Sequence, residues 1–143
     1  NAPIKMGNEL WFYYTATDGD HGSKFRNSRG GLAKIRMDGF VSINANEQMG
    51  YLTTKPILCD GGDLYINAKT DNGTISVVVL DEFGNEIDGT RNYDSAMLDS
   101  DSIEHKVTWR DHVNLNHLIG KKIRLKFYLK SANLFSFTIK TSE

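Results

Sequence analysis

Residues 122–140 read KIRLKFYLKSANLFSFTIK, and this stretch decides the fold class. In its first half every second residue is apolar: Ile123, Leu125, Phe127 and Leu129. Basic residues and a tyrosine lie between them, an alternation typical of a β-strand with one apolar and one polar face. After SAN at 131–133 the alternation resumes with Phe135, Phe137 and Ile139. We therefore predict two strands joined as a hairpin at 131–133.

The same two-residue period recurs at 64–69 and 103–110. The β-branched run TISVVVL at 74–80 is typical of a central strand buried on both faces. Asp-Asn-Gly at 71–73 predicts a hairpin between its flanking strands. Only 113–120, VNLNHLIG, could be helical, for about one turn. Short strands and turns with almost no helix predict an all-β protein, an antiparallel β-sandwich of jelly-roll-like topology.

Two further positions carry turn or edge signals. In MDGF at 37–40 the pair Asp38-Gly39 predicts the corner of a type I′-like hairpin. Pro56, after Lys55, has no N–H to donate, so it should interrupt a strand at the edge of a sheet.

The composition limits the classes of function. The chain has 143 residues, enough for a domain with its own core, and a net charge of -1. This balance gives no electrostatic reason to expect nucleic acid or an anionic membrane as partner. No apolar run approaches the roughly 20 residues that span a bilayer. Cys59 is the only cysteine, which excludes an internal disulfide and a cysteine-based zinc site, and we interpret it as a buried apolar residue.

Residues 9–22, ELWFYYTATDGDHG, combine an aromatic run with a polar loop. The run could form the rim of a binding site, in which Trp11 and His21 would contact a ligand. It could equally be a strand between packed layers, because aromatic residues fall on both of its faces. The sequence leaves open what would cover the second face.

The segment GGLAKIRMDGFVSINANEQMGYLTTKPILCDGGDLYINAKT, residues 30–70, resembles a motif of proteins related to family 32 glycoside hydrolases, the invertase-like enzymes. The matching positions are Gly31, Leu32, Ala33, Arg36, Asp38 to Ser42, Thr54, Lys55, Pro56, Gly62, Leu64 and Asn67. VVVLDEFGNEIDG at 77–89, SIEHKVTW at 102–109 and LIGKKIRLKFYLKSANLFSF at 118–137 resemble later strands of the same module. The resemblance runs from about residue 9 to residue 140.

In these enzymes a five-bladed β-propeller precedes a β-sandwich module. The resemblance therefore implies three parts: residues 1–16, similar to the last strand of a propeller; a connecting loop, 17–31; and the sandwich module, 32–143. The catalytic carboxylates of the family lie in propeller motifs that this sequence lacks. The resemblance thus implies a non-catalytic module whose parent protein is a glycoside hydrolase.

Carbohydrate is the ligand class that the surface residues favour. Sugar rings stack on aromatic side chains, and their hydroxyls bond to amide and charged groups. Tyr65 and Tyr128 are out of phase with their apolar neighbours, and Asn67 shares a face with Tyr65. Together with Trp11 and His21 these residues are our candidates for sugar contact. The alternative is that the tyrosines are ordinary sheet residues, or that their face docks on a propeller.

Metal binding has one weak candidate. Asp18 and Asp20 stand two apart beside glycine, as in part of a calcium loop, but the remaining oxygen ligands of that motif are missing. A structural calcium ion at Asp18 and Asp20, completed by backbone carbonyls, stays open. The histidines show no zinc-site spacing, and His105, in phase with apolar residues, is expected to be a hydrogen-bonded sheet residue.

We therefore expect a non-catalytic carbohydrate-binding or accessory β-sandwich module that requires no cofactor. The expected partners are a carbohydrate, such as a plant polysaccharide or fructan, and the parent propeller. Two alternatives remain: a purely structural module that supports a propeller, or a fragment with residual hydrolase activity. Self-association through the N-terminal strand is a further expectation, and the sequence leaves secreted and cytoplasmic locations equally open.

Overall fold

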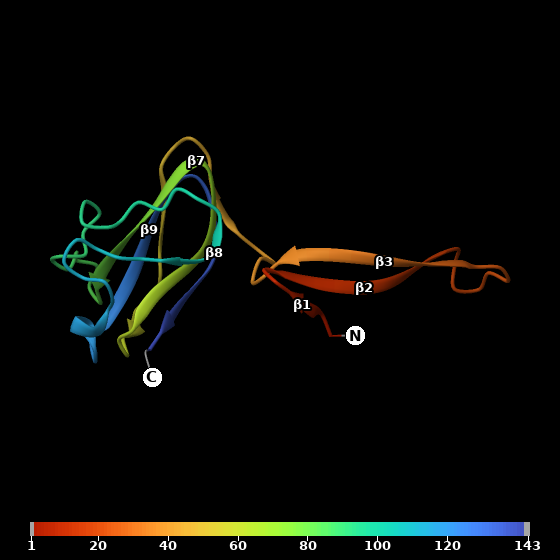
Figure 1. Ribbon diagram of the computed structural model, residues 1–143, viewed down its shortest axis with the longest axis horizontal. Coiled ribbons are helices and arrows are strands. Elements are labelled where there is room, and N and C mark those ends of the chain that lie inside the picture. Colours follow the sequence, from red (N-terminus) through yellow and green to blue (C-terminus); the bar gives the residue numbers. More distant parts are fainter. Residues whose placement is uncertain (1, 142–143) are drawn as a thin grey trace. The chain divides into compact units, whose positions relative to one another are not determined.

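The computed structural model describes residues 2–141, without the side chain of residue 71. The chain divides into two compact units, Asn1–Phe40 (unit 1) and Val41–Glu143 (unit 2), and both are built from antiparallel β-strands (Figure 1). The predicted all-β, sandwich-like fold is confirmed. Within residues 2–141 no helix has the length and apolar character to cross a bilayer.

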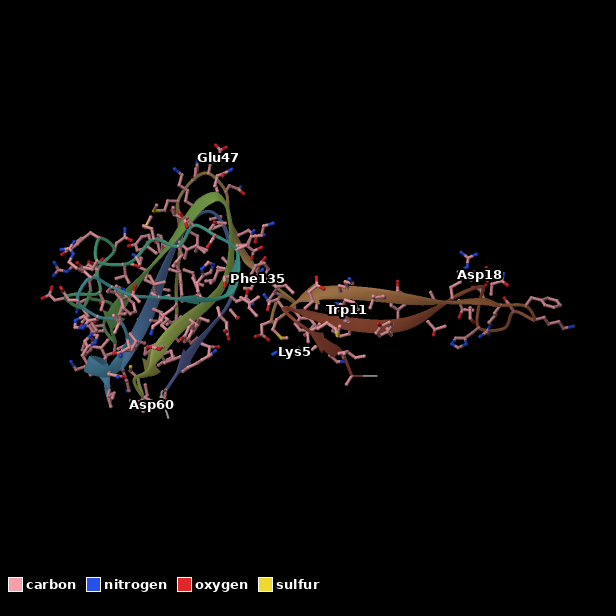
Figure 2. All side chains as sticks on the ribbon, viewed as in Figure 1. Lys5, Trp11, Asp18, Glu47, Asp60 and Phe135 are labelled. Carbon is pink, nitrogen blue, oxygen red and sulfur yellow. The ribbon has the colours of Figure 1, made fainter. Side chains whose placement is uncertain are left out.

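Unit 1 is a three-stranded sheet in the order β1 (Ile4–Met6), β2 (Glu9–Asp18) and β3 (Asn27–Arg36). The aromatic run at 11–14 forms a strand, as predicted, and β2 and β3 pair over their full lengths. No described residue of unit 1 is buried. Within unit 1 itself there is no second layer of strands, and side chains such as that of Trp11 project from the one sheet (Figure 2).

The predicted boundaries of the N-terminal parts need correction. Residues 27–31, expected in the connecting loop 17–31, belong to β3, and Asp18 still belongs to β2. Gly30 and Gly31 pair with Thr15 and Tyr14, and the missing side chain at Gly31 leaves room for the Tyr14 ring. Along the chain, the boundary between the units falls between Phe40 and Val41, not between residues 31 and 32 as predicted, because residues 32–36 complete β3.

Unit 2 is organised by two 19-residue strands, β7 (Asp63–Asp81) and β9 (Lys122–Lys140), which curve together along their lengths (Figure 1). The alternation in 122–130 is confirmed: one face of β9 is buried and the other is not. Residues 75–80 of β7 are buried on both faces, as predicted for a central strand. The inward side chains of both strands form most of the core, with Phe127 fully buried at its centre.

Neither predicted hairpin within these strands exists. The chain does not reverse at 71–73 or at 131–133; instead both strands bend there while remaining paired, and the register shifts between Thr70 and Thr74. Asn72 (φ 54°) and Ser131 (φ 43°) have left-handed backbones, and a Cβ on Gly73 would lie 1.9 Å from the Lys130 carbonyl oxygen. Turn-forming residues thus make a shared β-bulge, which lets two strands curl around one core.

Three short strands, β4 (Ile43–Ala45), β5 (Gly50–Thr53) and β6 (Ile57–Leu58), pair in turn with β9 and form one interrupted edge. Pro56 lies in the interruption between β5 and β6, as predicted. By contrast, Asp38-Gly39 makes no hairpin. The turn ends β3, and the next strand, β4, belongs to the other sheet, so the chain passes there from unit 1 to unit 2.

The opposite side of β7 is closed by β8 (Ser102–Lys106) and by loop segments. A turn follows β7 at 82–86, after which the Ile87 N–H bonds to the Val79 carbonyl. The one-turn helix appears as the 3₁₀ segment η1 (Asn116–Leu118), which contributes Leu118 to the core. Trp109, Leu115 and Cys59 complete this layer, and the buried position predicted for Cys59 is confirmed.

Candidate functional site

The outward face of β9 carries a pair of tyrosines. Tyr51 on β5 lies directly opposite Tyr128 on β9, and their ring centroids are 6.3 Å apart at 49°. Tyr128 alternates with the buried Phe127 and Leu129, so both tyrosines point away from the core. Tyr51 is 71% exposed. We call Tyr51, Lys126 and Tyr128 the tyrosine platform.

Lys126 lies two residues before Tyr128 and therefore on the same face. Its Nζ is 4.6 Å from the Tyr51 ring centroid and 4.8 Å from that of Tyr128. A hydrogen bond with Tyr128, helped by the more distant Glu86 carboxylate, raises the pKa of Lys126 despite partial burial. The ammonium group is thus a fixed positive charge beside two aromatic rings.

Hydrogen-bonding groups lie at one end of the tyrosine platform. Ser76 on β7 pairs with Tyr128 across the sheet, and the Ser76 hydroxyl donates to Asn92 Oδ1. Strands are spaced by about 4.8 Å, so the row from Tyr51 through Tyr128 to Ser76 spans roughly 10 Å. Ser76 itself is only 3% exposed, so the groups that a sugar chain can reach are the two rings, the Lys126 cation and the exposed Asn92 beside them.

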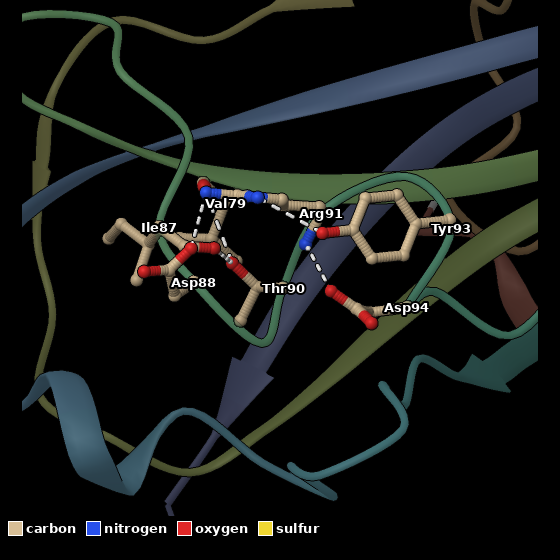
Figure 3. Close-up of polar contacts among 7 residues, drawn as sticks. All are labelled: Val79, Ile87, Asp88, Thr90, Arg91, Tyr93 and Asp94. Carbon is tan, nitrogen blue, oxygen red and sulfur yellow. Dashed lines mark hydrogen bonds and ion pairs between the residues drawn. The ribbon is translucent and has the colours of Figure 1, made fainter.

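Contacts within its own loop fix the position of Asn92. Arg91 extends between Asp88, with which it forms an ion pair, and the Tyr93 hydroxyl, to which it donates at 3.0 Å (Figure 3). The Arg91 N–H donates to Asp94, and the Thr90 hydroxyl donates to the Ile87 carbonyl at 2.9 Å (Figure 3). The loop is therefore held in one conformation, with Asn92 directed to Ser76.

The other predicted sugar-contact residues of unit 2 do not join the tyrosine platform. Tyr65 lies beyond the bend of β7, where the Lys140 ammonium group is 4.7 Å from its ring centroid. Asn67 was expected beside it on an accessible face, but Asn67 is only 3% exposed. We correct that prediction: the face of β7 at Asn67 is not accessible, and a buried amide cannot reach a ligand.

Tyr51 was missed by the sequence analysis. A signal existed, because Tyr51 precedes the half-buried Leu52 in the edge strand and is therefore out of phase with the core. The pairing of Tyr51 with Tyr128 could not be read from the sequence, since it depends on which short strand covers that part of β9.

The predicted residues of unit 1 lie along its hairpin. Trp11 Nε1 donates to Glu9 at 2.9 Å, and Lys34 Nζ is 4.1 Å from the Trp11 ring centroid. His21 is exposed in the loop between β2 and β3. The Asp18 carboxylate accepts from the Asn27 N–H at 2.8 Å and from its side-chain amide at 3.2 Å, which lowers the pKa of Asp18. Asp18 therefore closes the base of this loop.

Metal ligation has little geometric support within the described part of the chain. There, no three His, Cys, Asp or Glu side chains converge on one point. At the predicted calcium position Asp20 contributes its backbone carbonyl to Ser23. His105 is 9% exposed, and its Nε2 is 3.0 Å from the Ser100 carbonyl, as expected of a hydrogen-bonded sheet residue. The calcium ion remains a prediction.

An apolar groove of about 420 Å³ lies where β4 meets β9. Its lining residues are Val41, Ser42, Ile43, Leu52, Leu134, Phe135, Ser136 and Phe137. Two serines are the only polar residues of this lining, so the groove suits an apolar group better than a sugar.

Comparison with known proteins adds no relative. No family model matches the chain, and neither a curated protein nor a solved structure matches it significantly.

Proposed function

We propose that the chain is a non-catalytic carbohydrate-binding module that binds glycan on the tyrosine platform. The observation that carries this proposal is the Tyr51–Tyr128 pair on the outward face of the sheet, with Lys126 beside both rings. The two rings lie side by side across neighbouring strands, and Tyr51 is 71% exposed, so they can stack on successive sugars of an extended polysaccharide.

The absence of catalysis remains part of the proposal. A retaining glycosidase needs two carboxyl groups about 5 Å apart across the sugar. At the hairpin tip the Asp81 carboxylate accepts from the N–H groups of Phe83 and Asn85 and from the Asn85 amide. These bonds lower the pKa of Asp81, which suits a turn-forming acceptor and not a proton donor.

Calorimetry against fructans, xylans and other plant polysaccharides tests the proposal. Tyr51→Ala and Tyr128→Ala should each weaken binding roughly tenfold, the effect of losing about 1.4 kcal/mol of stacking. Phe83→Ala is the matched control, because Phe83 is an 84% exposed aromatic residue at a hairpin tip. No heat with any glycan, or equal losses for all three variants, would contradict binding at the platform. Turnover of a glycan by the unmutated chain would contradict the non-catalytic assignment.

A structural role is the second candidate, and one observation favours it. Unit 1 buries none of its described residues, and three strands without a covered face are marginal in water. Tyr13 and Tyr14 are each more than half exposed, and with Gly30, Gly31 and Leu32 they line a hollow of about 540 Å³. As this second candidate we propose that unit 1 packs on a β-propeller of the kind that the resemblance implies.

Hydrogen exchange combined with light scattering tests this second role. Alone in solution the chain should be a monomer with poorly protected amides in β2 and β3. A dimer that Leu32→Lys dissociates would identify a second copy of the chain as the cover. A monomer with strongly protected β2 and β3 amides would show that unit 1 needs no partner.

A further inference from the structure

Lys126 differs from other lysines of unit 2 in the groups that contact its ammonium. Lys106 bonds to Asp63 at 2.8 Å, Lys140 bonds to Glu104 at 2.7 Å, and Lys122 lies 3.8 Å from Glu82. Lys126 instead lies against two tyrosine rings, and within the described residues no carboxylate is within 4.0 Å of its Nζ. Its positive charge is therefore oriented by the two rings, with no carboxylate in direct contact and the Glu86 carboxylate as a weaker, more distant influence.

From this arrangement we propose that the tyrosine platform selects glycans that carry carboxylates, such as uronic acid polymers, and that Lys126 forms the ion pair with the acid. The proposal rests on the carbohydrate-binding function proposed above and names its ligand class. A sugar stacked on Tyr51 would place its ring substituents within reach of the Lys126 ammonium group. A charge-assisted hydrogen bond to a carboxylate is stronger than one to a neutral hydroxyl, so the acid is favoured.

The surroundings of the platform support an anionic ligand. Arg124 and Lys130 follow the same outward face of β9 on either side of Lys126 and Tyr128. Arg124 bonds to the carbonyls of Glu82 and Thr54, so it stays near the sheet as a positive charge. Since the whole chain has a net charge of -1, any attraction for an anion must come from this local stripe.

A matched pair of polymers separates charge from shape. Polygalacturonate and its methyl ester share one backbone and differ in the free carboxylates. Calorimetry should show about tenfold tighter binding of polygalacturonate, and the difference should shrink as sodium chloride is raised. Lys126→Met keeps the length of the side chain and removes its charge, so it should bring the two affinities together by weakening the acid polymer alone.

Lys69→Met is the control for net charge, because Lys69 is exposed on β7 beyond the bend. It should leave the preference for polygalacturonate intact. Equal binding of both polymers by the unmutated chain, with loss of both in Tyr51→Ala, would overturn the role of Lys126 and leave the carbohydrate-binding function standing. Equal effects of Lys126→Met and Lys69→Met would also overturn it. No binding of either polymer or of any neutral glycan would remove the function and this inference together.

Discussion

The two tryptophans of the chain lie in opposite surroundings. Trp109 in unit 2 is 3% exposed and donates from Nε1 to the Val77 carbonyl at 2.7 Å. Trp11 in unit 1 is half-buried, and its Nε1 bonds to the exposed carboxylate of Glu9. Both come from segments with strong β-forming residues, yet only one belongs to a core.

The difference shows that strand formation and core formation are separate requirements. In unit 2 the long strands curl, and the segment 107–118 covers their inner face. In unit 1 the hydrogen-bonded ladder is as regular, but the described residues of this unit form a single sheet with no second layer of their own. A sheet stabilised mainly by its ladder should respond weakly to side-chain truncation, whereas a packed core should respond strongly.

The largest contrast is expected between two phenylalanines. Phe127→Ala removes a fully buried ring from the core and should lower the free energy of unfolding by about 3–5 kcal/mol. Phe12→Ala removes a half-buried ring whose aromatic neighbour is Phe40, at 6.2 Å, and should cost about 1 kcal/mol or less. Urea unfolding followed by Trp109 fluorescence in a Trp11→Phe background measures the loss in unit 2, and Trp11 fluorescence in a Trp109→Phe background measures the loss in unit 1. Equal losses would mean that unit 1 is as well packed as unit 2.

A smaller contrast is expected between two glycines. A Cβ on Gly73 would lie 1.9 Å from the Lys130 carbonyl oxygen, so Gly73→Ala should push β7 and β9 apart at their bend and cost about 2–3 kcal/mol. A Cβ on Gly30 in β3 would have no atom within 4 Å, and Gly30→Ala should change stability by less than about 1 kcal/mol. Thermal unfolding of the two variants measures the difference. A fully stable Gly73→Ala protein would refute the close approach of the two strands.

The sequence predicted strands well and their connections poorly. Alternation located β9 and the buried face of β7, because side-chain period and burial are both local properties. The turn residues at 71–73 and 131–133 led to two wrong hairpin predictions. A glycine or a residue with a left-handed backbone occurs in a β-bulge as well as in a hairpin turn. Only the partner strand decides between the two, and that partner is distant in sequence.

The candidate site was predictable to the same extent. Tyr128 was identified by its phase in the strand, whereas Asn67, in phase with Tyr65, proved to be buried. Accessibility depends on which segments cover a face of the sheet, and the alternation of residues within one strand does not show this. Sequence phase thus identifies the face of a residue, but not whether another segment lies over it.

The tryptophans themselves give the next contrast. Trp109→Phe leaves the buried Val77 carbonyl without the indole donor and should cost about 1–3 kcal/mol. Trp11→Phe breaks an exposed bond to Glu9, which water replaces, and should be close to neutral. Guanidinium titrations followed by far-ultraviolet circular dichroism compare the variants without relying on indole fluorescence. A neutral Trp109→Phe would mean that the carbonyl finds another donor.

The smallest expected effect is a pH dependence of the stability of unit 2. The pKa of His117 lies below its ordinary 6.5, and burial is the largest cause. The stacked His112 ring, whose centroid is 3.7 Å away, and Lys121 lower it further. The unfolded chain therefore binds this proton more readily than the folded chain. This contribution to the free energy of unfolding should fall as the pH drops through 6.5, and should level off below the folded-state pKa.

Urea titrations at pH 7.5 and 5.0 measure this dependence, and His117→Gln should reduce the loss of stability on acidification. His112→Ala should reduce it too, because it removes both the stacking ring and a charge that opposes protonation of His117. An unchanged slope in His117→Gln would assign the acid sensitivity of unit 2 to its carboxylates, such as Asp81, whose pKa is lowered by Asn85.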